Sequence, residues 1–140
     1  MRKPDLTTFM KRAKHQSTML QVMRKKKFSW KTLLLCDIRL DRIPASTKFF
    51  HPYGICIRES VVFGENCTIL QGVTIGNKHP FIPSDGLTWI GNNVFFGAGS
   101  TILGDITIGN NVVIGAGAIV LADVPDNMTV VGTWKGEATV

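Results

Sequence analysis

Large apolar residues recur every six positions along most of this chain, in two runs separated by one interruption. An α-helix repeats every 3.6 residues and a simple strand every two, so neither requires a strict period of six. A second column of mostly small or branched residues stands two positions ahead of the first. The large residues are Ile57, Phe63, Ile69 and Ile75, then Ile90, Phe96, Ile102, Ile108, Ile114 and Val120. This period is typical of the hexapeptide repeats that form a parallel β-helix.

Each hexad supplies two inward side chains and then a corner. Alternate residues of a short strand face a narrow interior, and Gly or Asn at the corner tolerates a positive φ. Residues 91–93 and 109–111, both Gly-Asn-Asn, are such corners. A β-sandwich, the main all-β alternative, expects strand spacings that vary around ~8 to 12 residues. The fixed spacing therefore favours an all-β core made of a β-helix, with each coil stacked on the next.

The period sets the expected boundaries. It predicts a β-helix over residues 46–132, followed by a tail over 133–140. Residues 77–88 interrupt the repeat, because Ile75 and Ile90 lie 15 positions apart and 15 is not a multiple of six. This insertion contains two prolines, which favours a protruding arm over a packed coil.

Residues 1–45 have a different composition, and they predict a basic helical segment. Asp5 can cap a helix over 5–26, and a shorter helix is expected from Trp30 to Leu40. Residues 1–48 hold 13 Lys or Arg against 3 Asp or Glu, whereas 49–140 hold 3 against 7. The basic residues encircle a helix, so they suit a solvated helix, an acidic partner or an anionic membrane surface contacted by residues 1–27.

Composition also limits the class of protein. The longest apolar run, residues 33–36, is far shorter than the ~20 residues that span a bilayer, and no signal-peptide pattern precedes it. The three cysteines have no metal-ligand spacing, and Cys67 falls in an inward column as a small core residue. Few aromatic residues accompany the basic ones, which disfavours nucleic-acid binding. We expect a cytoplasmic protein that binds no metal. Peripheral contact with a membrane is the one other location that the composition suggests.

Four segments resemble the hexapeptide-repeat acyltransferases, in their serine acetyltransferase-like and sugar O-acetyltransferase branch. The resemblance covers roughly residues 43–132. It implies a left-handed β-helix, against the usual right-handed crossover. It also implies a homotrimer with active sites between neighbouring subunits, and acetyl-CoA as acyl donor. The segments are His51-Pro52-Tyr53-Gly54-Ile55, residues 69–76, residues 97–104 and residues 114–117.

The resemblance assigns the general-base role to His51. Acetyl transfer to a hydroxyl needs a base near the acceptor oxygen, and an imidazole suits that task near neutral pH. A structural turn residue is the alternative interpretation of a His followed by Pro. Of the other two histidines, His15 lies in the basic segment, and His79 lies in the arm but does not match the position of the family's second important His. His79 is therefore a weaker second candidate.

The resemblance places contacts to CoA at Ala98 and Ala116. These residues lie 18 positions apart, one turn of three hexads, so they are expected to stack on a single edge and leave room for the pantetheine arm. Gly97 and Gly115 flank them, although a structural corner explains each glycine equally well. Lys135 is a candidate for a CoA phosphate.

The chain departs from the family pattern at three places. Phe50 stands where serine acetyltransferases often have an Asp, and the region before His51 is one hexad shorter. Thr133-Trp134 replaces the residues that usually follow the last coil. The first departure favours a saccharide or similar hydroxyl as acceptor. Serine O-acetylation and amino-sugar N-acetylation remain open.

A γ-type carbonic anhydrase needs three His zinc ligands, and the β-helical part has two His. A non-catalytic scaffold or binding module is the alternative from another class.

Overall fold

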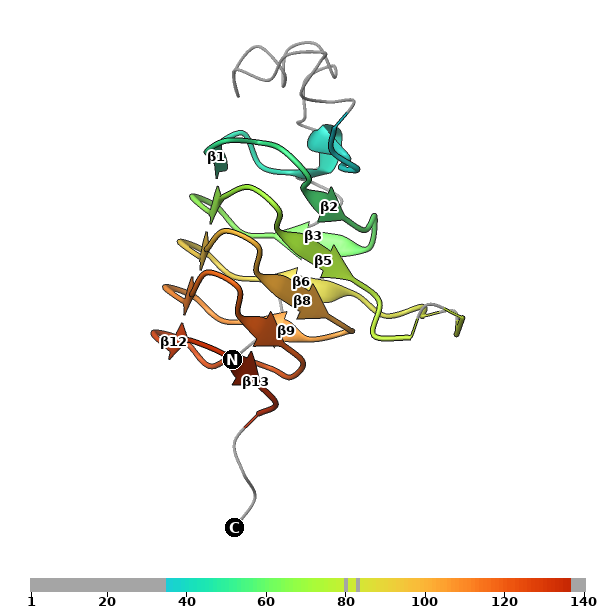
Figure 1. Ribbon diagram of the computed structural model, residues 1–140, viewed down its shortest axis with the longest axis vertical. Coiled ribbons are helices and arrows are strands. Elements are labelled where there is room, and N and C mark those ends of the chain that lie inside the picture. Colours follow the sequence, from blue (N-terminus) through green and yellow to red (C-terminus); the bar gives the residue numbers. More distant parts are fainter. Residues whose placement is uncertain (1–34, 80, 83, 137–140) are drawn as a thin grey trace.

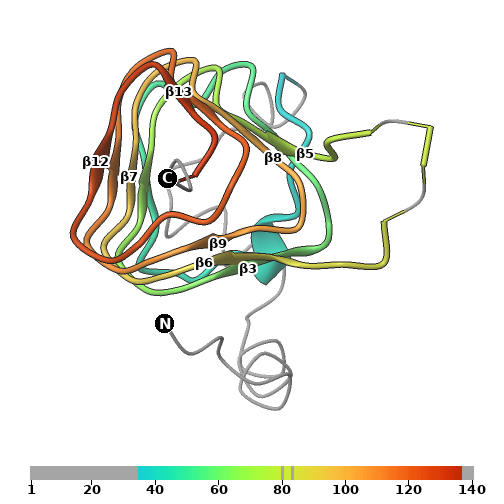
Figure 2. The same ribbon diagram turned by 90° about the horizontal axis from the view of Figure 1, so that it is seen from below.

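The protein is a left-handed parallel β-helix of three sheets, which form the three faces of a prism (Figures 1 and 2). The computed structural model describes residues 35–79, 81–82 and 84–136. The predicted helix over 5–26 and His15 lie outside these residues. Within the described residues, no helix is long and apolar enough to cross a membrane.

The strands are short, and each pairs with the strand on the same face of the next coil. Sheet A contains β2 (Cys56–Ile57), β5 (Thr74–Gly76), β8 (Thr101–Leu103), β11 (Ile119–Val120) and β13 (Thr133–Trp134). Sheet B contains β1 (Lys48–Phe49), β4 (Thr68–Ile69), β7 (Phe95–Phe96), β10 (Val113–Ile114) and β12 (Thr129–Val130). Sheet C contains β3 (Val61–Phe63), β6 (Thr88–Ile90) and β9 (Thr107–Ile108).

Both columns of the hexad face the interior, as the period predicts. Ile69, Ile75 and Ile102 of the large column and Val73 of the second column are fully buried. Thr88 and Ser100 replace aliphatic residues in the second column and are also buried. The Thr88 hydroxyl donates to the Gly104 carbonyl at 2.8 Å, which offsets the cost of burying this polar group.

Asparagine forms the corner between sheets C and B. Asn66, Asn93, Asn111 and Asn127 all have φ near +55 to +61°, a region that Asn tolerates because its short polar side chain hydrogen-bonds locally. The Asn93 side-chain amide donates to Asn111 Oδ1 at 3.1 Å, and Asn111 does the same to Asn127. The two predicted Gly-Asn-Asn corners are confirmed.

The β-helix begins earlier than expected. Asp37 forms a parallel bridge to Cys56, and Ile38 and Leu40 are buried in the core. The expected helix from Trp30 to Leu40 is wrong for its described part, because none of residues 35–39 is helical, Arg39 is extended, and the only helical element described there is a 3₁₀ turn, η1 (Leu40–Arg42). Pairing with the coil below satisfies the backbone here and buries two aliphatic side chains, which an isolated helical turn would leave exposed.

The other end of the β-helix extends past the boundary expected at residue 132. Strand β13 pairs with β11, with Thr133 beside Ile119 and Trp134 beside Val120. The Trp134 indole packs against the core and donates to the Asp123 carbonyl at 2.9 Å. This aromatic side chain continues the core beyond the last regular hexad, so the first two residues of the expected tail belong to the final coil.

The interruption at 77–88 leaves the prism at the corner between sheets A and C and projects into solvent (Figure 2). Phe81 is 96% exposed, and the strand pairing resumes at Thr88. The predicted arm is confirmed as a protrusion rather than a packed coil.

Candidate active site

His51 stands on the corner between sheets B and A in the uppermost complete coil. Phe49 pairs with Ile69, and Ile57 pairs with Ile75. Eight positions therefore separate the paired residues of the upper coil, against six in the coil below. The two extra residues push the corner outward, where His51 has φ of +51° and an exposed side chain. The imidazole makes no hydrogen bond to the described residues, so it is available to a ligand.

The same corner carries Ala98 and Ala116. Backbone N–H groups link successive coils here: Gly72 donates to the Tyr53 carbonyl at 2.9 Å, Gly99 to Gln71 at 2.9 Å and Gly117 to Ala98 at 2.8 Å. The expected stacking of the two alanines on one edge is confirmed. The coil of Ala98 lies two coils below that of His51, a distance of ~10 Å along the prism at ~4.8 Å per coil.

The edge below His51 is open. A Cβ built on Gly99 or Gly117 would have no heavy atom within 4 Å, and both glycines have φ of +67°. Ala98 is half-buried and Ala116 is exposed, so their methyl groups form a low surface. An extended ligand could lie along this edge without displacing a large side chain.

Gly97 and Gly115 have a structural explanation of their own. A Cβ on Gly97 would lie 2.5 Å from the Ala116 backbone nitrogen, and a Cβ on Gly115 would lie 3.1 Å from the Val130 carbonyl oxygen. The close stacking of coils therefore requires a residue without a side chain at position 97 and disfavours one at 115. Any contact to a ligand at these two positions would come from the backbone.

Lys135 does not lie on the edge formed by Ala98 and Ala116. It follows β13, so it stands at the end of sheet A that faces the arm corner, and its side chain is exposed. The corner before β13 is also shortened, since Ile114 pairs with Val130 and Ile119 with Thr133. Lys135 therefore makes no contact with the alanine edge. A long ligand that lies along this edge could still extend to the Lys135 side chain.

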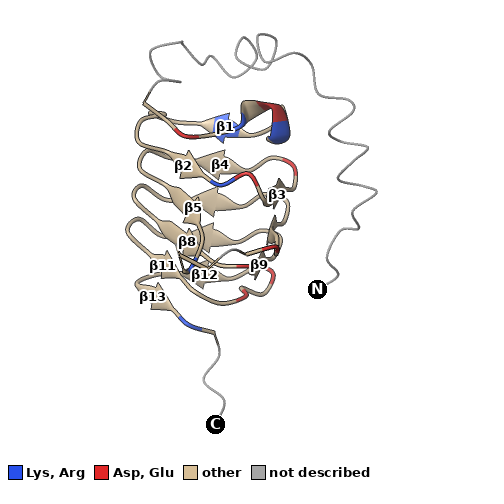
Figure 3. Ribbon diagram, turned by 90° about the vertical axis from the view of Figure 1, so that its right-hand side faces the viewer, with Lys and Arg blue, Asp and Glu red and all other residues tan. Residues whose placement is uncertain are grey.

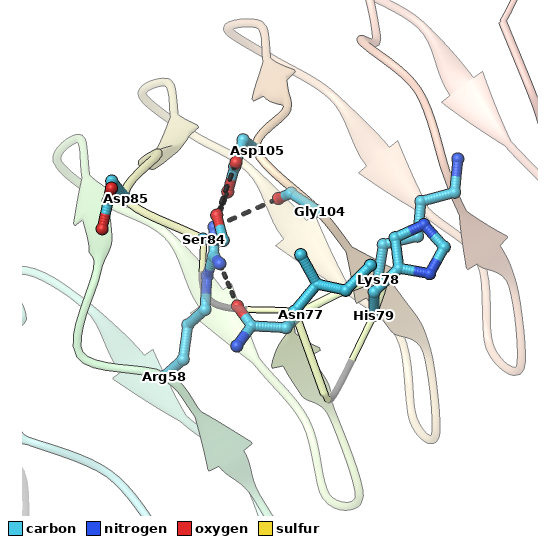
Figure 4. A pocket seen from close by; sticks show the side chains of 9 residues that line it. Arg58, Asn77, Lys78, His79, Ser84, Asp85, Gly104 and Asp105 are labelled. Atoms are coloured by element: carbon cyan, nitrogen blue, oxygen red, sulfur yellow. Dashed lines mark hydrogen bonds and ion pairs between the residues drawn. The ribbon is translucent and has the colours of Figure 1, made fainter.

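The arm encloses a second candidate site at the corner between sheets A and C (Figure 4). This pocket has a volume of about 390 Å³. Cationic and acidic side chains line it together, and His79 is exposed at its rim. The lining residues are Arg58, Asn77, Lys78, His79, Ile82, Ser84, Asp85, Gly104 and Asp105.

Arg58 ties both ends of the arm to the β-helix. Its guanidinium donates to Asn77 at the start of the arm and to the Thr88 hydroxyl at its end, the latter at 2.8 Å. It also pairs with the Asp105 carboxylate at 2.7 Å, and this carboxylate accepts a bond from the Ser84 hydroxyl at 2.6 Å. The Arg58 side chain is only 11% exposed. These contacts fix the arm at its root.

Sequence reasoning did not single out Arg58, because it occupies a variable position of the hexad. One signal was available, since residues 49–140 contain only three Lys or Arg. Arg58 is the one arginine among residues 49–140 and directly follows a predicted strand, which indicates a nearby carboxylate partner. The partner Asp105 is 47 residues away, so only the coiled arrangement identifies it.

His51 and His79 do not meet within one chain. His51 lies between β1 and β2 and His79 lies after β5, so they stand at the two opposite edges of sheet A. Figure 2 shows the arm at one edge of this sheet. A single site that uses both would need the arm of a second copy at the first copy's alanine corner.

The cysteines lack a metal-binding arrangement. Cys67 is fully buried, and burial raises the pKa of its thiol to about 11. Within residues 35–79, 81–82 and 84–136, no three His, Cys, Asp or Glu side chains gather as they would around a metal ion. The interpretation of Cys67 as a core residue is confirmed.

This chain is similar to known acetyltransferases. The model of the bacterial transferase hexapeptide (six repeats) matches residues 87–122. A putative colanic acid biosynthesis acetyltransferase, WcaB of Escherichia coli K12, is 51% identical over 84 residues, covering 59% of this chain and 49% of the relative. A serine acetyltransferase of Staphylococcus epidermidis is 45% identical over 89 residues, covering 59% of this chain and 38% of the relative.

A solved structure agrees with these matches. Neisseria gonorrhoeae serine acetyltransferase in complex with serine has a TM-score of 0.57 and 41% identity, covering 62% of this chain and 35% of that chain. This chain thus spans about half the length of the Escherichia coli relative and less of the others. The resemblance to the hexapeptide-repeat acyltransferases is confirmed.

Proposed function

We propose that this hexapeptide-repeat chain is an acetyl-CoA-dependent O-acetyltransferase that acts on a hydroxyl of a saccharide or a similar small acceptor. The observation that carries the proposal is the position of His51, raised on the same corner as the open edge of Ala98 and Ala116. The relatives are named as acetyltransferases, which supports the reaction class.

The alanine edge fits acetyl-CoA. The absence of atoms within 4 Å of a Cβ at Gly99 or Gly117 provides room for the thin pantetheine chain beside the two alanine methyl groups. When bound, acetyl-CoA supplies a thioester whose acyl group an oxygen nucleophile can accept. The N–H groups of Gly97 and Gly115 already donate to the Ile114 and Val130 carbonyls, so a ligand contact at these positions would be made by the glycine Cα atoms or by a second bond to their carbonyls. Lys135 is the candidate partner for a phosphate, which it would bind as a point charge.

His51 would act as general base. An alcohol is a poor nucleophile while protonated, and a neutral imidazole can accept its proton as the oxygen attacks. The exposed imidazole has no competing partner among the described residues. A backbone N–H of the glycine-rich coils would stabilise the negative charge that develops on the carbonyl oxygen.

A saccharide is the favoured acceptor because the relative that is 51% identical is named for colanic acid biosynthesis. Phe50, directly before His51, is 52% exposed, and it offers an apolar face for a sugar ring but no carboxylate to pair with the ammonium group of serine. Serine is the second candidate, supported by the names of the serine acetyltransferases. Amino-sugar N-acetylation uses the same donor edge and base.

The proposed assembly is a homotrimer in the cytoplasm, whose basic residues 1–27 contact an anionic membrane surface. The placement of His51 and His79 at opposite edges of sheet A supports an assembly in which one copy's arm walls the neighbour's site. The density of Lys and Arg in residues 1–27 supports attraction to an anionic surface.

The test is release of free CoA from acetyl-CoA across a panel of mono- and oligosaccharides, amino sugars and L-serine. We expect acceptor-dependent release with at least one saccharide and weaker release with serine. Release with serine alone would replace the saccharide by the second candidate. A ligand that binds the folded state raises its thermal stability. If the protein neither releases CoA from acetyl-CoA nor gains thermal stability when CoA is added, it would instead be a scaffold or binding module.

A further inference from the structure

The three Lys and Arg residues between positions 49 and 136 all lie at one corner of the β-helix. Arg58 follows β2, Lys78 follows β5 and Lys135 follows β13, so each stands where a strand of sheet A ends at the arm corner. Figure 3 looks onto the side from which the arm projects and shows basic segments directly after β2 and β13. The positive charge of this part of the chain is therefore gathered at the corner that carries the arm pocket, the cavity of about 390 Å³ that the arm encloses.

Two charged side chains of the arm pocket neutralise each other. Arg58 pairs with Asp105 at 2.7 Å, and the Ser84 hydroxyl lies 2.7 and 2.6 Å from the two oxygens of the same carboxylate. The other two charged lining residues are Lys78 and Asp85, which form no ion pair within the described part of the chain. Their ammonium and carboxylate groups are therefore available to a ligand.

Gly104 determines the path of the Lys78 side chain. The Gly104 N–H donates to the Gly76 carbonyl at 3.0 Å, which stacks this glycine beside the start of the arm. A Cβ on Gly104 would lie 3.6 Å from Lys78 Cβ and 4.0 Å from Lys78 Cδ, so the aliphatic part of Lys78 passes over a residue without a side chain. The Lys78 ammonium is carried beyond it, on the exposed side of the pocket.

Asp85 stands on the opposite side of the arm pocket, with Ser84 between it and Lys78 (Figure 4). Its two neighbours in the chain are both held near the β-helix. Ser84 bonds to the Asp105 carboxylate, and a Cβ on Gly86 would collide with that same carboxylate, so the arm approaches the β-helix closely here. The position of Asp85 is therefore defined, although its side chain is exposed.

A ligand that bridges Lys78 and Asp85 needs an anionic group at one end and hydrogen-bond donors at the other. An ammonium group binds a phosphate or a carboxylate as a point charge. An ionised carboxylate only accepts hydrogen bonds, so it suits hydroxyl groups. The volume of the pocket falls within the range of about 300 to 1,000 Å³ that is usual for small-molecule sites. An α-amino acid carries both charges on one carbon and does not span the pocket, whereas a sugar with one anionic group does.

We propose that the arm pocket binds a saccharide that carries a phosphate or carboxylate group, with the anionic group on Lys78 and the sugar hydroxyls on Asp85. This site is separate from the proposed acetyl transfer, because His51 and the alanine edge lie at the other edge of sheet A. Binding is therefore measured without acetyl-CoA, and its result does not depend on the outcome of the CoA-release test.

The test is NMR titration of the ¹⁵N-labelled full-length protein with glucose 6-phosphate, glucuronate and glucose. We expect at least one of the two charged sugars to bind, with shifts at residues of the arm pocket, and glucose to bind about tenfold more weakly or less. Lys78→Gln should weaken binding of the charged sugar by about tenfold, because it removes the charged partner of the anionic group. Lys48→Gln, which removes the same charge from the exposed face of sheet B, is the matched control and should bind as the natural sequence does.

The sugar ring is tested separately from its charge. Asp85→Ala should reduce the preference for glucose 6-phosphate over inorganic phosphate. Tighter binding of glucose 6-phosphate than of glucuronate would identify the group as a phosphate, and the reverse order would identify a carboxylate. Inorganic phosphate that binds as tightly as glucose 6-phosphate, or L-serine that binds more tightly, would rule out the saccharide. Absence of binding by both charged sugars, or equal affinity in the natural sequence and Lys78→Gln, would overturn the proposal.

Discussion

The Arg58 guanidinium pairs with the Asp105 carboxylate at 2.7 Å across two coils of the β-helix. Arg58 follows β2 and Asp105 follows β8, so the pair spans the coil from which the arm projects. This contact holds the root of the arm in a defined position beside the second candidate site.

Replacing Arg58 by Met should loosen the arm. The substitution removes bonds to Thr88, Asn77 and Asp105 at once, and hydrogen bonds to charged groups contribute about 1.5 to 3 kcal/mol each at most. We expect faster chymotrypsin cleavage at the exposed Phe81 and a higher KM for the acceptor, with little change in KM for acetyl-CoA.

Arg58→Lys is the conservative control, and it should restore part of the protease resistance because it keeps the charge beside Asp105. Slower or unchanged cleavage at Phe81 in Arg58→Met would show that the arm is held by other contacts. Cleavage does not depend on catalysis, so this result separates the role of Arg58 from the proposed reaction.

His51→Gln should lower kcat by roughly 10²- to 10⁴-fold, the usual contribution of a general base. The side chain is exposed and makes no hydrogen bond to the described residues, so the thermal unfolding midpoint should hardly change. His79→Gln is the matched control on the other corner. An unchanged rate in His51→Gln with a large loss in His79→Gln would exchange their proposed roles.

Ala116→Phe should block the donor edge. Position 116 is exposed, so the larger side chain can be accommodated without disturbing the core, but it would fill the space beside Gly117. We expect loss of the thermal shift produced by CoA. Val113→Phe, on the exposed face of sheet B, should retain it, and equal loss in both variants would argue against a specific edge.

Gly97→Ala should destabilise the fold strongly. The added Cβ would approach the Ala116 nitrogen to 2.5 Å, and the backbone of two stacked coils would have to move. We expect a loss of more than about 3 kcal/mol, a size that indicates a steric or core defect. Gly76→Ala is the matched control, since its Cβ would make only an ordinary 3.7 Å contact with the Leu103 side chain. Chemical denaturation of both variants measures the difference.

Alkaline pH should destabilise the protein through Cys67. Burial raises the pKa of this thiol from 9.0 to about 11 in the folded protein. The folded state therefore favours the neutral thiol, and this contribution is complete below pH 9 and is lost as pH rises toward 11. Cys67→Ala should flatten the fall in unfolding free energy across this range. A fall of the same size in the variant would assign the effect to other groups.

The period of six was enough to predict the coil, its corners and the stacked alanines, because each hexad repeats the same local requirement. The boundaries were less accurate. Ile38, Leu40 and Ile43 join the core and Trp134 packs against it, although the segments that hold them lack the repeat. Their segments pair with neighbouring coils, and this pairing does not require the repeat. Arg58 also escaped notice, because its partners Asn77, Thr88 and Asp105 are distant along the chain.

By itself the sequence determined the parallel β-helix, the arm and the identity of the chemistry-bearing residues, because these depend on side-chain type and on spacing within one coil. Only the tertiary structure decided which corner each of these residues occupies. It placed His51 on the same corner as Ala98 and Ala116, and it separated His79 from them by the width of sheet A. The corner that each residue occupies depends on which strands pair, because insertions of two residues before Ile57 and nine before Ile90 leave the coil at a corner and the strand pairing resumes after them.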